Sequence, residues 1–219
     1  MSYERERERM LTEQLCARGL RDPNVLEAMR SVPRHLFVRS TETKRAYEDT
    51  PLPIGRNQTI SQPYMVALMT EALGITGGEK IMEVGTGSGY QAAVLAWMGA
   101  RVISVECIPE LAMRARTVLG SLGMLDRVDV VESDGTLGWP AEAPYDGIVV
   151  TAGAPEIPRP LLEQLAPGGR LVLPMGEREL QTLVRIRRAP EGLVEEYLGD
   201  CRFVQLCGRY GWDEPEPEG

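Results

Sequence analysis

The sequence contains a single histidine, His35, among its 219 residues, and its four cysteines form no close pair. One histidine and no Cys-x-x-Cys pattern do not make a zinc site, and we expect no bound metal. The cysteine content is also too low for a secreted disulfide scaffold. We therefore expect reduced, structural thiols and a structural histidine. The cysteines are Cys16, Cys107, Cys201 and Cys207.

Long apolar runs and a surplus of basic residues are missing as well. No stretch approaches the roughly 18 to 20 apolar residues of a membrane span, and the first residues include no apolar signal segment. Acidic residues outnumber basic ones, 32 to 24, which gives a formal charge of −8 and argues against nucleic-acid binding. We expect a cytoplasmic protein with no membrane and no nucleic-acid partner. The absence of a Gly-Lys-Ser/Thr loop argues against ATP or GTP hydrolysis.

The composition that remains is that of an ordinary folded protein, with 43% hydrophobic and 26% charged residues. The length suits one α/β domain rather than two. We expect a single domain over residues 1–212, with an N-terminal helical and loop portion at 1–75 and a ligand-binding α/β core at 76–212. Four acids lie in the last seven residues, so we expect residues 213–219 to be an acidic, disordered tail.

From residue 76 onward, short apolar runs alternate with helix-length segments. This alternation predicts βαβ units with right-handed crossovers, and hence a doubly wound, Rossmann-like, mostly parallel sheet. The last strands lack intervening helices, which predicts an antiparallel edge. The expected strands are 80–84, 101–105, 128–132, 146–151, 170–174, 180–186, 193–197 and 202–206, and the expected helices are 90–97, 109–122 and 160–165.

The first 75 residues predict a helical cap on this sheet. Asp22 before Pro23 is a typical helix start, and Pro63 can start another helix that Gly74 would end. Residues 51–63 are rich in Pro, Gly, Gln, Thr and Ser, and we expect them to form a loop. Thr59 and Ser61 would thus lie just before a helix N-terminus, where free N–H groups favour anionic ligands.

A glycine-rich loop follows the first predicted strand and opens a helix. Glycines there let the backbone turn tightly and approach a ligand at the helix N-terminus, although a simple tight turn would look similar. The loop is Glu83-Val84-Gly85-Thr86-Gly87-Ser88-Gly89-Tyr90.

The acids around this loop favour S-adenosylmethionine over NAD. Glu106 ends the second strand, where a carboxylate can accept hydrogen bonds from ribose hydroxyls, as in either cofactor. The glycines run Gly-x-Gly-x-Gly, and Glu83 precedes them by two residues, which suits the amino-acid tail of S-adenosylmethionine. Asp134-Gly135, after the third strand, is placed to meet the adenine amino group.

The sequence as a whole resembles the protein-L-isoaspartate (D-aspartate) O-methyltransferase family from about Leu15 to Trp212. Beyond the glycine loop, which many methyltransferases share, two segments are specific to this family. They are Val32-Pro33-Arg34-His35 and Gln58-Thr59-Ile60-Ser61-Gln62-Pro63. Further matching pieces are Pro51-Leu52-Pro53-Ile54-Gly55, Gly138-Trp139-Pro140, Gly168-Gly169-Arg170 and Arg202-Phe203-Val204.

This resemblance implies a methyltransferase fold and a protein repair enzyme. Such enzymes transfer a methyl group from S-adenosylmethionine to the α-carboxylate of an isoaspartyl residue, and the ester returns through a succinimide to aspartate. The resemblance makes Ser61 the active-site serine and isoaspartyl proteins and peptides the substrates; we expect a monomer. The expected cofactor-binding residues are Thr59, Ile60, Ser61, Glu83, Gly85, Thr86, Gly87, Ser88, Gly89, Glu106, Asp134 and Gly135.

The match has three departures from the family pattern, at Ser133, Gly153 and Cys207. The last two lie in segments that we expect near the substrate, which leaves the peptide preference open. The alternatives are a methyltransferase dedicated to one peptide or protein, a non-catalytic S-adenosylmethionine-binding module, and a dehydrogenase. Ser61 has an alternative role as the cap of the helix after Pro63.

Overall fold

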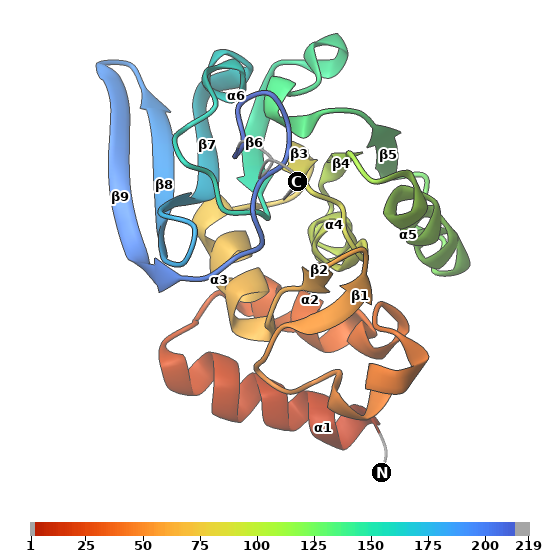
Figure 1. Cartoon of the computed structure of the whole chain (residues 1–219). Helices are drawn as coiled ribbons and strands as arrows, with labels where there is room; N and C mark the ends of the chain where they lie inside the picture. Colours follow the sequence, from red (N-terminus) through yellow and green to blue (C-terminus); the bar gives the residue numbers. More distant parts are fainter. Residues whose placement is uncertain (1–2, 213–219) are drawn as a thin grey trace.

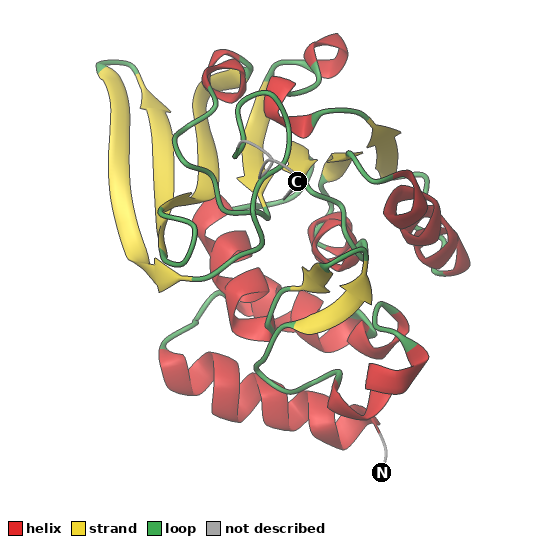
Figure 2. Cartoon of the chain, in the orientation of Figure 1, coloured by secondary structure: helices red, strands yellow, loops and turns green. Residues whose placement is uncertain are grey.

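The computed structural model describes residues 3–212, so the acidic tail expected at 213–219 lies outside the described residues. A layer of N-terminal helices lies at one end of a large twisted sheet, and a short hairpin lies between the two (Figure 1). Figure 2 shows that the N-terminal layer consists of helices and connecting loops apart from this hairpin. This arrangement confirms the predicted helical cap.

The first helical segment of the described residues changes its backbone hydrogen-bonding pattern along its length. Helix α1 (Tyr3–Arg9) continues into a π-helical turn and a 3-10 turn, which ends at Gly19. Met10, Leu11 and Leu15 are buried, as their spacing predicts. Helix α2 (Pro23–Ser31) starts at Asp22, whose carboxylate accepts hydrogen bonds from the N–H groups of Asn24 and Val25. The four short turns of the cap are η1 (Met10–Leu15), η2 (Cys16–Arg18), η3 (Arg34–Leu36) and η4 (Ser40–Arg45).

The segment predicted as a loop contains two short strands, β1 (Leu52–Gly55) and β2 (Gln58–Ile60), which pair antiparallel. Its proline and glycine content hid the hairpin, whose turn holds Arg56 and Asn57 at positive φ. Helix α3 (Pro63–Leu73) is the next element along the chain and ends at Gly74, as predicted. The backbone of Gly74 lies in the left-handed region.

The remaining chain forms a seven-stranded sheet in the order β5-β4-β3-β6-β7-β8-β9. The first five strands are parallel, and β8 and β9 add an antiparallel edge. The predicted fold class is therefore confirmed. The strands are β3 (Lys80–Val84), β4 (Arg101–Glu106), β5 (Val128–Glu132), β6 (Tyr145–Val150), β7 (Leu165–Gly176), β8 (Gln181–Ala189) and β9 (Gly192–Cys201). The helices between them are α4 (Tyr90–Trp97), α5 (Pro109–Ser121) and α6 (Arg159–Glu163), with short turns η5 (Gly135–Leu137) and η6 (Pro140–Glu142).

The strand order reverses at β3. The chain runs outward from β3 to β4 and β5, and then returns to place β6 on the other side of β3. In open α/β sheets, ligands bind outside the carboxyl ends of the strands at such a switch point. The topology therefore predicts a ligand-binding site at the carboxyl ends of β3, β4 and β6.

Two predictions near the end of the chain are wrong in detail. Residues 202–206 form no strand, because their backbone bonds go to Gly153 rather than to β9: Gly153 donates to Val204 O and accepts from Leu206 N. The helix expected at 160–165 ends at Glu163, since Leu165 already pairs with Tyr145 as the first residue of β7.

Buried apolar side chains cover both faces of the sheet. One cluster joins the N-terminal helices to α3, α4 and one face, so Met10 and Phe37 share a core with Val102 and Val149. The second cluster covers the other face around Met82, Ile148 and Leu171. The N-terminal layer thus shares one apolar core with one face of the sheet, including Ile81 of β3 and Val102 of β4.

Candidate active site

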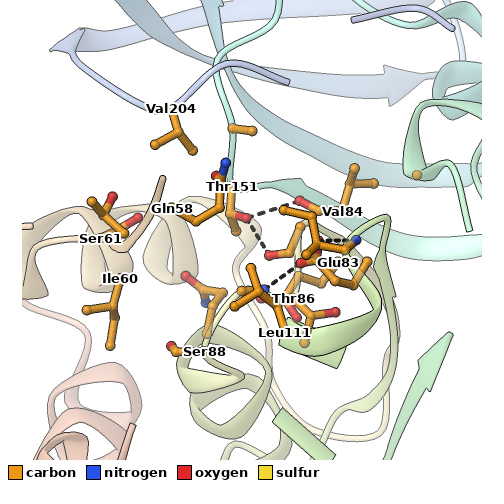
Figure 3. A pocket seen from close by; sticks show the side chains of 18 of the residues that line it. Gln58, Ile60, Ser61, Glu83, Val84, Thr86, Ser88, Leu111, Thr151 and Val204 are labelled. Atoms are coloured by element: carbon orange, nitrogen blue, oxygen red, sulfur yellow. Dashed lines mark hydrogen bonds between the residues drawn. The ribbon is translucent and has the colours of Figure 1, made fainter. Parts of the chain in front are cut away.

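A cavity of about 860 Å³, including its mouth, opens at the switch point. Its size is that of a small-molecule site. Ile60 and Ser61 lie on one side of it, and Glu83, Val84 and Thr86 lie on the other (Figure 3). All the predicted cofactor-binding residues except Gly89 and Asp134 line this cavity.

The glycine loop is held by Thr151 at the end of β6. The Thr151 hydroxyl donates to the carbonyl oxygens of Gly85 and Val84, at 2.6 and 3.1 Å. Gly85 has a φ of +93°, and a Cβ there would lie 2.6 Å from the Thr151 oxygen. Only glycine fits this position, which explains the first glycine of the motif.

Glu83 lies at the base of the cavity and is fully buried. Its Oε2 accepts a hydrogen bond from the Ser104 hydroxyl, which is itself bonded to the Thr86 hydroxyl. Its Oε1 is buried and forms no hydrogen bond with any residue from 3 to 212. Burial raises the pKa of Glu83 to about 8; the Ser104 hydrogen bond opposes this rise and the nearby Glu106 adds to it.

Glu106 ends β4 and is 5% exposed. Its Oε2 accepts from the Gly87 N–H at 2.8 Å and its Oε1 from the Ile108 N–H at 3.0 Å. One carboxylate thereby fixes the glycine loop and the start of α5 while lining the cavity. Carboxylate oxygens can each accept more than one bond, so Glu106 keeps capacity for a ligand hydroxyl.

Ser61 lies where the main cavity meets a second one of about 310 Å³. Thr59, Thr151 and Val204 also line both cavities. Helix α3 has no side-chain cap from its N-cap residue Gln62, and no hydrogen bond of the Ser61 hydroxyl forms within residues 3–212. The alternative role of Ser61 as a helix cap therefore finds no support in the geometry.

Asp134 lies beside the cavity, and both of its carboxylate oxygens already accept hydrogen bonds from other groups of the protein. Its Oδ1 accepts from the N–H and hydroxyl of Thr136, and its Oδ2 accepts from the Arg209 N–H at 2.8 Å. The next residue, Gly135, does line the cavity, and a Cβ there would lie 2.6 Å from Val84 Cγ1. Gly89 instead packs against α5, with Ala115 3.3 Å from where its Cβ would be.

Residues 204–207 form one wall of the cavity, and none of them was among the expected cofactor-binding residues. Their sequence signals were the resemblance at Arg202-Phe203-Val204 and the departure at Cys207, whose segment was expected near the substrate. The Trp212 indole anchors this segment by donating to the Gly153 carbonyl at 2.9 Å. Other lining residues that were not among the expected cofactor-binding residues are Gln58, Val66, Met69, Val84, Tyr90, Gln91, Val105, Cys107, Ile108, Leu111, Thr151 and Ala152.

The three departures from the family pattern have different surroundings. Ser133 is not among the described residues at positive φ, so serine fits its backbone without strain. A Cβ at Gly153 would lie 2.9 Å from the Gln181 side chain, so alanine there would require that side chain to move. Cys207 lines the main cavity.

His35 lies as expected for a structural residue, whereas two of the thiols, Cys107 and Cys207, are exposed and line the main cavity. The His35 ring stacks on Tyr3 with centroids 3.9 Å apart, and its Nδ1 lies 2.8 Å from the Tyr47 hydroxyl. It lines neither cavity. Cys16, Cys107 and Cys201 are free thiols. Over residues 3–212, no group of three or more metal-binding side chains occurs and no helix is long and apolar enough to cross a bilayer.

The sheet order, the glycine loop and the acid at the end of β4 define an S-adenosylmethionine-dependent methyltransferase. Residues 5–211 match the family described as protein-L-isoaspartate(D-aspartate) O-methyltransferase, and the chain belongs to this family. The members are protein repair enzymes that use S-adenosylmethionine. The predicted family, function, enzyme class and cofactor are confirmed.

Similar proteins cover nearly the whole chain. The protein-L-isoaspartate O-methyltransferase 1 of Syntrophobacter fumaroxidans is 56% identical over 97% of this chain and 99% of its own. The Geobacter metallireducens protein-L-isoaspartate O-methyltransferase is 54% identical over 99% of this chain and 100% of its own. A solved protein-L-isoaspartate O-methyltransferase is 31% identical, with a TM-score of 0.84 over 94% of this chain and 67% of its own. A Plasmodium falciparum structure described as this enzyme, in complex with S-adenosyl-L-homocysteine, is 27% identical, with a TM-score of 0.78 over 92% of this chain and 98% of its own.

Proposed function

We propose that the main cavity binds S-adenosylmethionine and that the isoaspartyl carboxylate enters through the second cavity, so that the two meet at Ser61. The observation that carries this proposal is that Ser61, Thr59 and Thr151 line both cavities. A two-substrate transfer needs such a junction, because alignment of the reacting groups supplies much of the rate.

The residues present suit the cofactor. The unpartnered Oε1 of Glu83 offers an acceptor for the amino group of its methionine portion. Glu106 offers a carboxylate for the ribose hydroxyls, and the apolar Ile108 and Leu111 suit an adenine face. When bound, the cofactor supplies an electrophilic methyl group on a sulfonium.

The acceptor needs no general base from the protein. A free α-carboxyl has a pKa of about 3.3 to 3.7, so it is already ionised at neutral pH. The Ser61 hydroxyl, which makes no hydrogen bond within the described part of the chain, is proposed to donate to one carboxylate oxygen and hold the other toward the main cavity. The distant His35, whose Nδ1 is bonded to Tyr47, takes no part.

Arg202 lines the second cavity and brings a positive charge to the proposed acceptor site. The guanidinium would favour a peptide that carries a free carboxylate over an ordinary peptide. Methylation of D-aspartyl residues belongs to this proposal as a second acceptor. We propose a monomeric enzyme in which residues 1–212 act as one domain, since the N-terminal helices share one apolar core with the sheet. The free thiols of Cys16, Cys107 and Cys201 support the proposal of a cytoplasmic location.

The experiment compares methyl transfer from labelled S-adenosylmethionine to two synthetic peptides that differ only in one Asp-Gly or isoAsp-Gly linkage. Base-labile methanol measures the ester formed. We expect label on the isoAsp peptide alone. Label on both peptides would contradict the proposed acceptor selection. Label on neither, with the cofactor still bound, would instead indicate a dedicated protein partner.

A further inference from the structure

Helix α3 begins two residues after Ser61, and its first turn is capped by a side chain from elsewhere in the chain. The Asp49 Oδ1 accepts a hydrogen bond from the Tyr64 N–H at 3.0 Å. Tyr64 is the second residue of the helix, and its N–H is one that an N-cap side chain normally satisfies. Asp49 therefore makes the bond that Gln62 or a nearby serine would otherwise provide.

Asp49 is itself held in place by a cation. Its Oδ2 accepts from Arg18 Nη1 at 2.8 Å, and the Gln62 side-chain amide lies 3.5 Å from the same oxygen. The Arg18 guanidinium lies over the Tyr64 ring, 3.3 Å from its centroid. Arg18, Asp49 and Tyr64 thus form one connected unit at the start of α3.

The backbone of Ser61 has a second anchor on its other side. Arg34, fully buried, donates from Nη2 to the Ser61 carbonyl oxygen at 2.7 Å. The segment from Ser61 to Tyr64 is thereby fixed at both ends by charged groups of the N-terminal layer. The Ser61 hydroxyl takes part in neither anchor.

We propose that Asp49 is a positioning residue for methyl transfer: by capping α3 in place of Ser61, it fixes the Ser61 backbone and leaves the hydroxyl free for the acceptor carboxylate. This inference rests on the role of Ser61 proposed above. Without Asp49, the Tyr64 N–H loses its acceptor and the segment loses one of its two anchors. A shift of even one ångström at a reacting group can lower turnover by roughly a hundredfold.

The matched control is Asp22, which caps α2 through the same kind of bond to Asn24 and Val25 and lines neither cavity. Alanine at either position removes one helix cap and should therefore lower the melting temperature to a similar extent. Asp49→Asn keeps an oxygen that can accept from Tyr64. Comparing Asp49→Asn with Asp49→Ala therefore distinguishes the effect of the hydrogen bond to Tyr64 from the effect of the carboxylate charge.

The experiment measures kcat, KM for the isoAsp peptide, and the dissociation constant for S-adenosylhomocysteine. For Asp49→Ala we expect kcat to fall roughly tenfold or more, with cofactor affinity little changed. Asp49→Asn should recover most of kcat, and Asp22→Ala should keep it while losing similar thermal stability. In a Ser61→Ala background, Asp49→Ala should have almost no further effect on kcat, because the two act through one hydroxyl.

Several results would overturn the inference. Unchanged kcat in Asp49→Ala, an equal loss in Asp22→Ala, or a full additional loss in the Ser61→Ala background would each do so. If Asp49→Ala does not fold, Asp49→Asn decides alone: a folded protein with kcat reduced by roughly tenfold contradicts the hydrogen-bond role. If Ser61→Ala itself keeps kcat, the role proposed for Ser61 fails. If Ser61→Ala lowers kcat while Asp49→Ala leaves it unchanged, only the present inference about Asp49 fails.

Discussion

The Arg34 guanidinium donates a 2.7 Å hydrogen bond to the backbone carbonyl of Ser61, and its Nε donates another of 2.7 Å to Ala46. It is fully buried, with its carbon 4.9 Å from the centroid of the Tyr90 ring. Burial lowers the pKa of Arg34 to about 10, which leaves it charged at neutral pH. A buried cation therefore joins the N-terminal layer to the active-site loop.

Arg34→Lys should lower the free energy of unfolding by about 2 kcal/mol or more, because a lysine cannot reproduce the fork that reaches two carbonyl groups. Chemical denaturation measures this change. The control is Arg30→Lys, since Arg30 forms exposed ion pairs with Glu8 and Glu27 and should matter little. Equal effects of the two substitutions would contradict a special role for Arg34.

Ser61→Ala should lower turnover by roughly ten- to a hundredfold and leave thermal stability and cofactor affinity nearly unchanged. The reason is that the Ser61 hydroxyl lines both cavities and takes no part in capping α3. Steady-state kinetics with the isoAsp peptide and calorimetric titration with S-adenosylhomocysteine measure the two quantities. A joint fall of turnover and cofactor affinity would show that the serine is structural.

Glu106→Ala should weaken the binding of S-adenosylhomocysteine by about 1.5 to 3 kcal/mol, the usual value of a hydrogen bond to a charged group. Loss of the bonds to Gly87 and Ile108 adds to the effect by loosening the loop. Glu132→Ala is the control, because Glu132 pairs with Glu106 across β4 and β5 but bonds to Arg116 and lies outside the cavity. Unchanged affinity in Glu106→Ala would place the ribose elsewhere.

The sheet and its glycine loop could be predicted from sequence because each depends on neighbouring residues. Buried strands such as β3 and β6 are short segments in which apolar residues predominate. The first glycine of the loop is required locally, because Gly85 has a positive φ. The apolar pattern predicted a strand at residues 202–206, but the backbone forms none there. The apolar side chains of this segment instead line the cavity or pack into the core.

The contacts that complete the site could not be predicted, because they join distant positions. Arg34 reaches Ser61 across 27 residues, and Arg209 reaches Asp134 across 75. Neither pair has a sequence spacing that marks it. The expected contact of Asp134 with adenine came from its place after β5 alone, which does not reveal where its two oxygens bond.

Asp134→Ala should release the segment that carries residues 204–207, since Asp134 Oδ2 accepts from Arg209 and Thr136 Oγ1 accepts from Tyr210 N–H. We expect faster proteolysis within residues 204–212 and weaker cofactor binding. The affinities for S-adenosylhomocysteine and for its analogue lacking the adenine amino group should fall by the same factor. A loss confined to S-adenosylhomocysteine would instead support the direct adenine contact expected from sequence.

Glu83 should make the stability of the ligand-free protein decrease as pH rises from about 4.5 to 8. Burial raises its folded pKa to about 8, whereas an unfolded glutamate has a pKa of about 4.3. The folded state thus holds a proton that the unfolded state has lost. The resulting stability is complete below the unfolded pKa and is lost as pH rises through the folded pKa.

Glu83→Gln removes this titration while keeping an oxygen that can accept from Ser104. The melting temperature of Glu83→Gln, measured by calorimetry without cofactor, should therefore depend less on pH between 5 and 8 than that of the wild type. At pH 8 the variant should melt higher, because the wild type must then bury a charge. The same substitution should weaken S-adenosylmethionine binding, since a neutral amide attracts the methionine ammonium less than a carboxylate does. Parallel pH profiles for the two proteins would show that Glu83 is not the titrating group.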